Sequence, residues 1–245
     1  FLASYIMKWI KDNIKGGKTL AGFFNFFLYP VIGTFVVGTL MLFVVGKPVA
    51  LLNTGLTNWL NAMQGTNAIL LGALIGAMVS FDLGGPVNKA AYAFCLGAMG
   101  NGNLIPYATF ASVKMVSAFT TTLVTKLKPK YFLEEERELG NSTWILGLAG
   151  ITEGAIPVAL NDPFRVLGSF VAGSMVTGAI VAYFKLGLGV PGAGILSMLF
   201  MNWNGAESSL MGGIVWFAAA LVGTVISTIL LLILKGHKYK KSLGQ

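Results

Sequence analysis

Residues 211–234 form an apolar stretch without a single charged side chain. As a helix that rises about 1.5 Å per residue, a stretch of this length crosses the roughly 30 Å hydrocarbon core of a bilayer. Further apolar runs, several of them too short for a full crossing, occupy residues 22–45, 68–81, 90–99, 105–127, 144–160, 166–184 and 190–201. The sequence therefore predicts an all-α polytopic membrane protein.

The small share of charged residues excludes most other classes of protein. Only 11% of the 245 residues are charged and 55% are hydrophobic, whereas soluble domains carry about 25% charged residues. This composition excludes a disordered chain, a disulfide scaffold and a coiled coil. The single cysteine, Cys95, lies in an apolar run. It allows no internal disulfide or zinc cluster, and we expect it to be an inert packing residue.

The lysines flank the apolar runs instead of forming one basic face. They gather in residues 8–18 and 235–241, and a charged belt at residues 126–138 lies between these groups. By the positive-inside rule, this arrangement places both termini and the belt on the cytoplasmic side. It does not favour nucleic acid as a partner. Within the belt, we expect residues 134–138 to be a solvated loop, with contact to a cytoplasmic partner domain as the alternative.

The first third of the chain predicts two interfacial segments around one span. In residues 1–17 the basic residues follow apolar ones, which is the reverse of a signal peptide. We therefore expect the end of an interfacial helix, in a chain that begins within a domain. Residues 22–45 are expected to form a spanning helix that is kinked at Pro30 and ends at residues 47–48. The apolar residues of 51–63 share one helical face, which predicts an interfacial helix.

The mixture of full-length and short apolar runs predicts broken helices or re-entrant hairpins. Non-helical backbone at membrane depth survives only where protein or a water-filled cavity surrounds it. Transporters build binding sites near the bilayer midplane from such breaks, and channels with re-entrant loops share the pattern. The sequence shows no clear internal repeat, so symmetry does not choose between these two classes.

Charged side chains in or beside the apolar runs mark candidate functional sites. Each costs about 2.5–3.5 kcal/mol at the bilayer centre, so each needs a partner or a hydrated cavity. They are Asp82, Lys89, Lys114, Glu153, Asp162 and Arg165. All except Lys114 fall into two clusters, at residues 81–94 and 150–166. We expect Lys114 either to extend towards the interface or to pair with an acid elsewhere.

The first cluster predicts a helix break. We expect one helix to end at residues 84–85 and the next to begin at Pro86, where the missing amide is tolerated. The free amides of a helix N-terminus favour hydroxyl or anionic groups, and Asn88 and Lys89 in the first turn could donate to the same ligand. The alternative is a buried Asp82–Lys89 ion pair that holds the break together.

The second cluster contains a carboxylate without a local cation. Glu153 has no lysine or arginine within one helical turn of sequence. It must therefore meet a distant cation, carry a proton or bind a polar ligand, and carboxylate oxygens accept hydrogen bonds from sugar hydroxyls. Asp162, followed by Pro163, has the pattern of a helix N-cap and is expected to pair with Arg165.

The two clusters resemble a known family. GGPVNKAAYAF at residues 84–94 and GITEGAIP followed by DPFRV within residues 150–166 resemble the two signature segments of the fructose-type C component of the bacterial phosphoenolpyruvate-dependent sugar phosphotransferase system. The resemblance covers essentially the whole chain, including LYPVIGT at residues 28–34. FCLGAM at residues 94–99 and ASVKMVSAFT at residues 111–120 are similar to the branch that transports 2-O-mannosyl-glycerate.

The resemblance implies a multi-pass protein of the bacterial inner membrane that binds a sugar, either fructose-like or 2-O-mannosyl-glycerate. Cytoplasmic A and B phosphocarrier domains would phosphorylate this sugar as it enters. The phosphate-carrying cysteine belongs to the B component, and Cys95 does not match that role. The chain is therefore expected to be a transport subunit of the phosphotransferase, without a catalytic residue, cofactor or metal of its own.

The family also implies an architecture, which resembles the fold of the glucose–fructose superfamily of transporters. Its members suggest a homodimer in which a transport part moves against a scaffold part in an elevator-like motion. Residues 1–66 then correspond to the end of the scaffold part, and residues 67–245 to the transport part.

The substrate-binding residues that the resemblance implies are drawn from both clusters. Glu153 comes first, and the others are Asn88, Lys89, Thr152, Asp82, Asp162 and Arg165. A lysine and a helix N-terminus would suit the carboxylate of mannosyl-glycerate, although fructose-type members share the same motif.

Two other classes stay open from the residues alone. A proton- or ion-coupled secondary transporter would use Glu153 as its proton carrier, and uptake driven by a pH gradient without a B component would identify it. A channel would lack steep, saturable sugar specificity.

Overall fold

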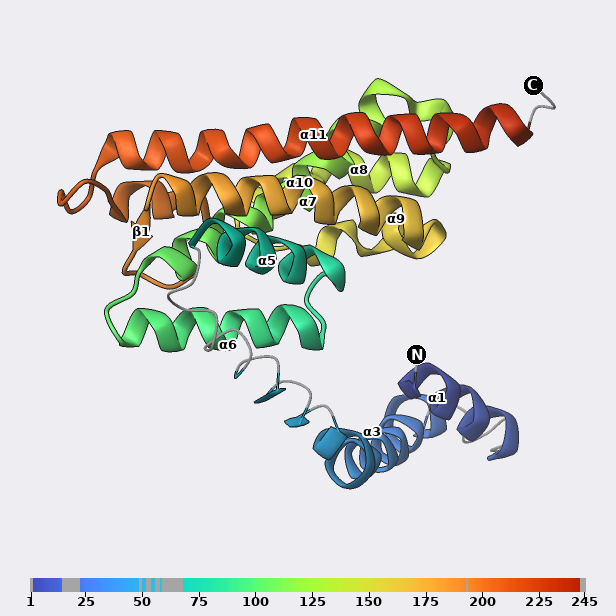
Figure 1. Ribbon diagram of the computed structural model, residues 1–245. Coiled ribbons are helices and arrows are strands. Elements are labelled where there is room, and N and C mark those ends of the chain that lie inside the picture. Colours follow the sequence, from blue (N-terminus) through green and yellow to red (C-terminus); the bar gives the residue numbers. More distant parts are fainter. Residues whose placement is uncertain are drawn as a thin grey trace. The chain divides into compact units, whose positions relative to one another are not determined.

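The computed structural model (Figure 1) describes residues 2–14, 23–48, 50–51, 54–55, 58, 68–192 and 194–242. The chain divides into two compact units, Phe1–Thr54 and Gly55–Gln245, and each is considered by itself. The expected interfacial helix at residues 51–63 lies almost entirely outside the described residues.

The first unit consists of two packed helical segments. They are α1 (Leu2–Asn13) and a longer helix made of the π-helical turn η2 (Phe24–Leu28), α3 (Tyr29–Leu40) and the π-helical turn η3 (Met41–Val45). Ile10 of α1 is buried, and the Tyr29 hydroxyl donates to the carbonyl of Ile14 at 2.6 Å. A side chain at Gly33 would collide with Met7, so the glycine allows α1 and α3 to approach closely.

The two prolines of the longer helix each follow a π-helical turn. Pro30 comes after η2 and Pro48 after η3. A π turn shifts the hydrogen-bond register by one residue, and this shift relieves the demand for the amide that a following proline lacks. The chain is still helical at Lys47 and Pro48, and the next residue lies outside the described ranges, so the predicted end of the helix at residues 47–48 stays a prediction. The kink expected at Pro30 stays a prediction.

The second unit contains the remaining helices and one small sheet. The α-helices are α5 (Ala68–Phe81), α6 (Pro86–Gly100), α7 (Ile105–Leu127), α8 (Glu134–Leu148), α9 (Ile156–Asn161), α10 (Pro163–Tyr183) and α11 (Leu210–Ser242). Single turns of 3₁₀-helix form η4 (Pro129–Tyr131) and η5 (Glu153–Ala155), and η6 (Gly194–Phe200) is longer. The strands β1 (Gly187–Leu188) and β2 (Met201–Asn202) pair antiparallel.

The apolar runs and helix-breaking residues of the sequence predicted the positions of most of these helices. α5 and α7 coincide with the predicted runs 68–81 and 105–127, and α6 begins at Pro86 as expected. The run at residues 144–160 is interrupted between α8 and α9, which confirms the prediction of a broken segment. The run at residues 190–201 is not an α-helix, because η6 and the start of β2 occupy most of it.

Among the described residues of the second unit, two helices are long and apolar enough to cross a membrane, Pro163–Tyr183 and Leu210–Lys238. α11 turns large apolar side chains such as Leu221, Val225 and Ile229 outward, and an exposed apolar face of this kind suits contact with lipid. α7 is slightly longer than α10, but it is rich in serine and threonine, and 17 of its 23 residues are buried. It is therefore an interior helix of this unit, and its expected crossing of the membrane stays a prediction.

α10 packs against α5 through residues without bulky side chains. A Cβ added at Gly72 would lie 2.3 Å from the carbonyl oxygen of Gly178, and one added at Gly76 would collide with the carbonyl of Ser174. The hydroxyls of Ser80 and Ser174 also lie 2.6 Å apart, within hydrogen-bond distance. Small residues four apart let helix backbones approach closely, a common way for membrane helices to associate.

A neighbouring face of α10 packs against α11 in the same manner. A Cβ added at Gly173 would lie 2.3 Å from the carbonyl oxygen of Gly223. The Thr177 hydroxyl donates to the carbonyl of Ala219 at 3.0 Å. Figure 1 shows α10 and α11 lying side by side along the length of the second unit. These two interfaces fix the helices that support the polar cavities described below.

Candidate functional site

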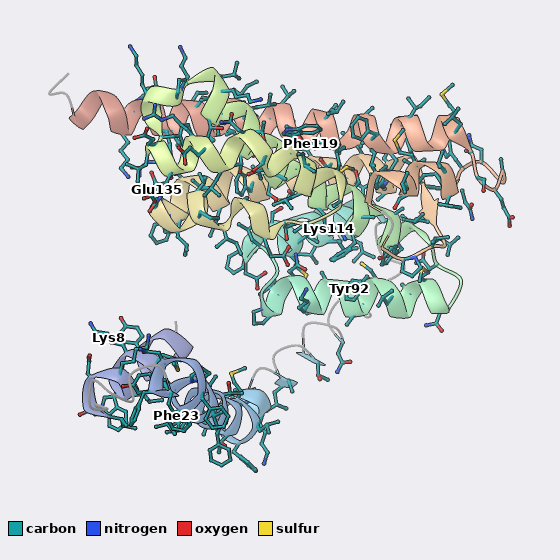
Figure 2. The ribbon with its side chains drawn as sticks, turned by 180° about the vertical axis from the view of Figure 1, so that it is seen from behind. Lys8, Phe23, Tyr92, Lys114, Phe119 and Glu135 are labelled. Carbon is teal, nitrogen blue, oxygen red and sulfur yellow. The ribbon has the colours of Figure 1, made fainter. Side chains whose placement is uncertain are left out.

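The two predicted clusters meet at one cavity of about 320 Å³ in the second unit. α6, α7 and the break between α8 and α9 supply most of its wall. The lining residues are Asn88, Lys89, Tyr92, Tyr107, Phe110, Lys114, Gly150, Ile151, Thr152, Glu153 and Gly192. Figure 2 labels two of them, Tyr92 and Lys114. We call this space the Glu153 cavity.

A glycine-terminated turn brings Glu153 into this cavity. Gly150 follows the end of α8 with a φ of 75°. Its amide donates to the carbonyl of Gly147, and the amide of Ile151 donates to that of Leu146, both at 2.9 Å. This is the hydrogen-bond pattern of a Schellman motif, which ends a helix and turns the chain. The chain then enters η5, whose first residue is Glu153.

The Glu153 carboxylate lies against the first cluster. Gly84 has a φ of 108°, and a Cβ added there would lie 2.5 Å from Oε1 of Glu153. The buried Thr152 donates its hydroxyl to Oε2 of Glu153 at 3.3 Å. Glu153 itself is accessible to solvent. A carboxylate that is held on one side by glycine and threonine therefore faces an open polar space on the other.

Asp82 serves the start of α6 and does not line the cavity. Its Oδ2 accepts a hydrogen bond from the amide of Val87 at 2.7 Å, and its Oδ1 accepts one from the amide of Asn88 at 3.0 Å. No ion pair joins Asp82 to Lys89 within the described residues, so that alternative was wrong. The prediction that these N-terminal amides are free to bind a ligand was also wrong, because they already donate hydrogen bonds to the Asp82 carboxylate.

Asn88 and Lys89 line the cavity in different ways. Asn88 is buried and donates its side-chain amide to the carbonyl of Val79 at 2.7 Å, which leaves its carbonyl oxygen for other partners. Lys89 is exposed. The structure therefore brings four of the residues expected to bind substrate, Asn88, Lys89, Thr152 and Glu153, around one space.

Several lining residues were not predicted as part of a site. The rings of Tyr92, Tyr107 and Phe110 form one aromatic group with centroids 5.3–6.3 Å apart. Lys114 was expected to extend to the interface or to pair with an acid, but it lines the cavity instead. Tyr107, Phe110 and Lys114 recur at helical spacing on one face of α7, and this spacing is the signal that could have grouped them.

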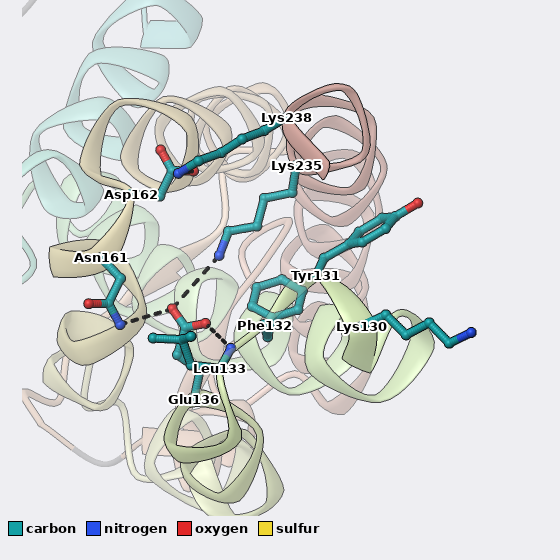
Figure 3. Close-up of a pocket in the computed structure, with 9 residues that line it drawn as sticks. All are labelled: Lys130, Tyr131, Phe132, Leu133, Glu136, Asn161, Asp162, Lys235 and Lys238. Carbon is teal, nitrogen blue, oxygen red and sulfur yellow. Dashed lines mark hydrogen bonds and ion pairs between the residues drawn. The ribbon is translucent and has the colours of Figure 1, made fainter. Parts of the chain in front are cut away.

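Asp162 and Arg165 belong to a different place. Asp162 lines a second cavity of about 370 Å³ (Figure 3). It occupies the N-cap position of α10 but makes no side-chain capping hydrogen bond. Its carboxylate instead pairs with Arg165 at 3.1 Å, as expected, and with Lys238 at 3.1 Å. Neither residue lines the Glu153 cavity.

The acidic run at residues 134–138 corrects a further expectation. It is not a solvated loop but the first turn of α8, and Figure 2 labels Glu135 in it. Glu136 is only 2% exposed. Figure 3 shows its carboxylate accepting from the amide of Leu133 at 2.7 Å and from the side chain of Asn161 at 3.2 Å, with Lys235 at 3.7 Å. The charged belt and the end of α11 therefore lie together.

The pairing of Asp162 predicts a pH-dependent stability. Burial alone would raise the pKa of this carboxyl, but Lys238 and Arg165 outweigh it and hold the pKa below its usual range. The paired carboxylate therefore stabilises the fold above the unfolded-state pKa of about 3.9, and this contribution is lost as pH falls through the lower folded-state pKa.

We expect Asp162→Asn to lower the thermal unfolding midpoint by a few degrees at neutral pH. The gap to the wild type should close as the pH falls below about 4. Asp12→Asn, at an exposed acid of the first unit, is the matched control and should change little. A gap of the same size at every pH would contradict the ionic role.

The fold and the first cavity together describe a largely helical protein that has helices long and apolar enough to cross a membrane and a polar cavity beside them. Three curated relatives are similar to this chain, and the last of them, which it covers to more than two thirds, shows its family. The chain is 61% identical over 238 residues, 97% of this chain and 36% of the relative, to the PTS system 2-O-alpha-mannosyl-D-glycerate-specific EIIABC component of Escherichia coli K12. It is 35% identical over its whole length, and 63% of the relative, to a PTS system fructose-specific EIIC component of Haloferax volcanii. It is 33% identical, over 89% of this chain and 68% of the relative, to the Fructose permease IIC component of Bacillus amyloliquefaciens.

The chain belongs to the fructose-type C-component family of the sugar phosphotransferase system. It spans little more than a third of the length of several relatives, such as the 36% covered in the mannosyl-glycerate protein. No family model matches the chain, and no solved structure does.

Proposed function

We propose that this protein is the membrane-translocating C component of a phosphotransferase sugar permease. It binds a sugar in the Glu153 cavity and carries it across the bacterial inner membrane for phosphorylation by a cytoplasmic B component. The observation that carries this proposal is the contact between Gly84 and Glu153. This contact brings together, at one cavity, the two segments by which the sequence resembles the family.

The cavity has the composition expected of a sugar site. Small-molecule sites combine apolar and aromatic walls with a few placed polar groups. Here Tyr92, Tyr107 and Phe110 supply the aromatic surface, and Glu153 and Asn88 supply oxygen atoms that accept hydrogen bonds from hydroxyl groups. The relatives' names leave two substrate types, fructose and 2-O-mannosyl-glycerate, and we take the second as the first to test because that relative is the more similar of the two.

The phosphoryl group must come from another domain. Cys95 is completely buried in the apolar core, where a thiol cannot exchange a phosphoryl group with a soluble partner. The relatives named EIIABC and EIIB'BC combine the C component with A or B components. We therefore propose cytoplasmic A and B domains as partners, fused to this chain or separate from it.

The proposed architecture is a multi-pass homodimer of the glucose–fructose superfamily type. The residues of the Glu153 cavity all lie in the second unit, Gly55–Gln245, in keeping with a transport part at residues 67–245. Residues 1–66 would then complete a scaffold that carries the dimer contacts.

A phosphorylation assay tests the function. Membranes containing the protein, supplied with phosphoenolpyruvate, the general phosphotransferase components and 2-O-mannosyl-glycerate, should form sugar phosphate only when an active B component is present. Removing that component, or replacing its cysteine where it is fused, should stop the product completely. Uptake driven by a pH gradient in the absence of B would instead identify the ion-coupled transporter.

A further inference from the structure

Lys114 is the charge in the Glu153 cavity that the site as described does not use. It projects from α7 between residues that are almost completely buried, among them Phe110, Val113 and Met115. Its ammonium lies 5.2 Å from the centre of the Phe110 ring. On the other side it reaches the turn before Glu153, since a Cβ added at Gly150 would lie 3.4 Å from Nζ of Lys114.

A second lysine of the same unit shows what Lys114 lacks. Lys235 also lies over a phenylalanine ring, 4.1 Å from the centre of Phe132. Its ammonium forms an ion pair with the Glu136 carboxylate at 3.7 Å. Within the described residues, Lys114 forms no ion pair. Two lysines therefore share one kind of setting, but only Lys235 has a protein carboxylate within ion-pair distance, while Glu153 lines the same cavity as Lys114 without forming an ion pair with it.

The energetic balance favours an anionic partner for Lys114. A lysine at mid-membrane costs about 2.5–3.5 kcal/mol, and a cation–π contact returns about 0.5–2 kcal/mol. The basic and acidic side chains that line the cavity are Lys89, Lys114 and Glu153. Asp82 does not line it, and backbone amides donate hydrogen bonds to its carboxylate. The cavity therefore carries a surplus of one positive charge.

We propose that Lys114 binds an acidic group of the substrate, so that the cavity selects a sugar derivative bearing a carboxylate over a neutral sugar. This inference rests on the proposed function and names its substrate class. Glu153 would take hydroxyl groups of the sugar, and the aromatic group would pack on the ring. Lys114 would hold the carboxylate of the attached acid, which is how 2-O-mannosyl-glycerate differs from fructose.

The test compares an acid with its neutral form. Binding of 2-O-mannosyl-glycerate and of its carboxyl methyl ester would be measured by titration calorimetry on the whole protein in detergent. We expect the wild type to prefer the acid, and Lys114→Met to weaken binding of the acid at least about tenfold while binding of the ester changes little. Lys114→Arg should restore most of the preference. Lys126→Met, at an exposed lysine of the same helix, should leave both affinities unchanged.

The outcomes separate this inference from the proposed function. Equal affinity of the wild type for acid and ester would overturn the role of Lys114, as would an equal loss for both ligands in Lys114→Met. If Glu153→Gln weakens both ligands while Lys114→Met weakens neither, the sugar site stands and the inference about Lys114 fails. If Glu153→Gln weakens neither ligand but Lys114→Met still weakens only the acid, the sugar-binding role of Glu153 fails and the carboxylate contact stands.

Discussion

Replacing Glu153 with glutamine is expected to reduce sugar affinity by about 100-fold and to abolish uptake, with the helical fold retained. The carboxylate is the acceptor nearest the point where the two family segments touch. A hydrogen bond to a charged group contributes about 1.5–3 kcal/mol. Glutamine keeps one acceptor oxygen, so loss of one such bond to a sugar hydroxyl corresponds, at the upper end of this range, to about 100-fold in affinity. Binding would be measured by calorimetry and uptake with labelled sugar.

A matched control and a second variant make this result decisive. Glu207 is an exposed loop acid, and Glu207→Gln should bind and transport normally. Unaltered affinity in both Glu153→Gln and Glu153→Ala would remove Glu153 from the site. Normal binding combined with loss of pH-gradient coupling would instead favour the proton-carrier role.

Replacing Gly84 with alanine is expected to inactivate transport although it adds only one methyl group. Gly84 has a φ of 108°, a conformation that L-residues rarely adopt. The new Cβ would also lie 2.5 Å from the Glu153 carboxylate and displace it. We expect a loss of stability of about 1–2 kcal/mol from the backbone and, in addition, a loss of sugar affinity similar to that of Glu153→Gln.

Gly102 separates these two effects. It has a comparable φ of 85°, but a Cβ added there would contact nothing within 4 Å. Gly102→Ala should therefore lower the thermal unfolding midpoint as Gly84→Ala does and leave sugar affinity unchanged. Equal affinities for the two variants would show that the Gly84–Glu153 contact has no part in binding.

The sequence predicted the helices best where an apolar run ends at glycine, proline or a charged group. α5 and α7 have the predicted limits for this reason, and Pro86 marks the start of α6. The acidic run at residues 134–138 was wrongly predicted to be a loop, although four of its five residues are exposed as expected. Acidic residues favour the first turn of a helix. The Glu136 carboxylate also accepts a hydrogen bond from the amide of Leu133, as in a capping box, and both features describe the start of α8.

The site could be predicted only in part because its contacts are long-range. The Asp162–Arg165 pair was readable because the residues are three apart on one helix start. No local pattern connects Glu136 with Lys235 or Asp162 with Lys238. Lys114 was recognised as an unusual charge, but its place beside Gly150 depends on how α7 packs against a turn that follows the next helix.

The ion pairs in Figure 3 have a mechanical consequence for the segment that carries Glu153. Glu136 in the first turn of α8 pairs with Lys235 of α11, and Asp162 after α9 pairs with Lys238 of α11. Between these two residues the chain runs along α8 to the turn at Gly150 and returns through α9. The segment between residues 136 and 162 is therefore attached to α11 at both ends, and Glu153 lies between the two attachments. A movement that separates Glu153 from α11 must therefore either break one of these two ion pairs or bend the segment between them. Without such a change, Glu153 and α11 move together as one rigid body.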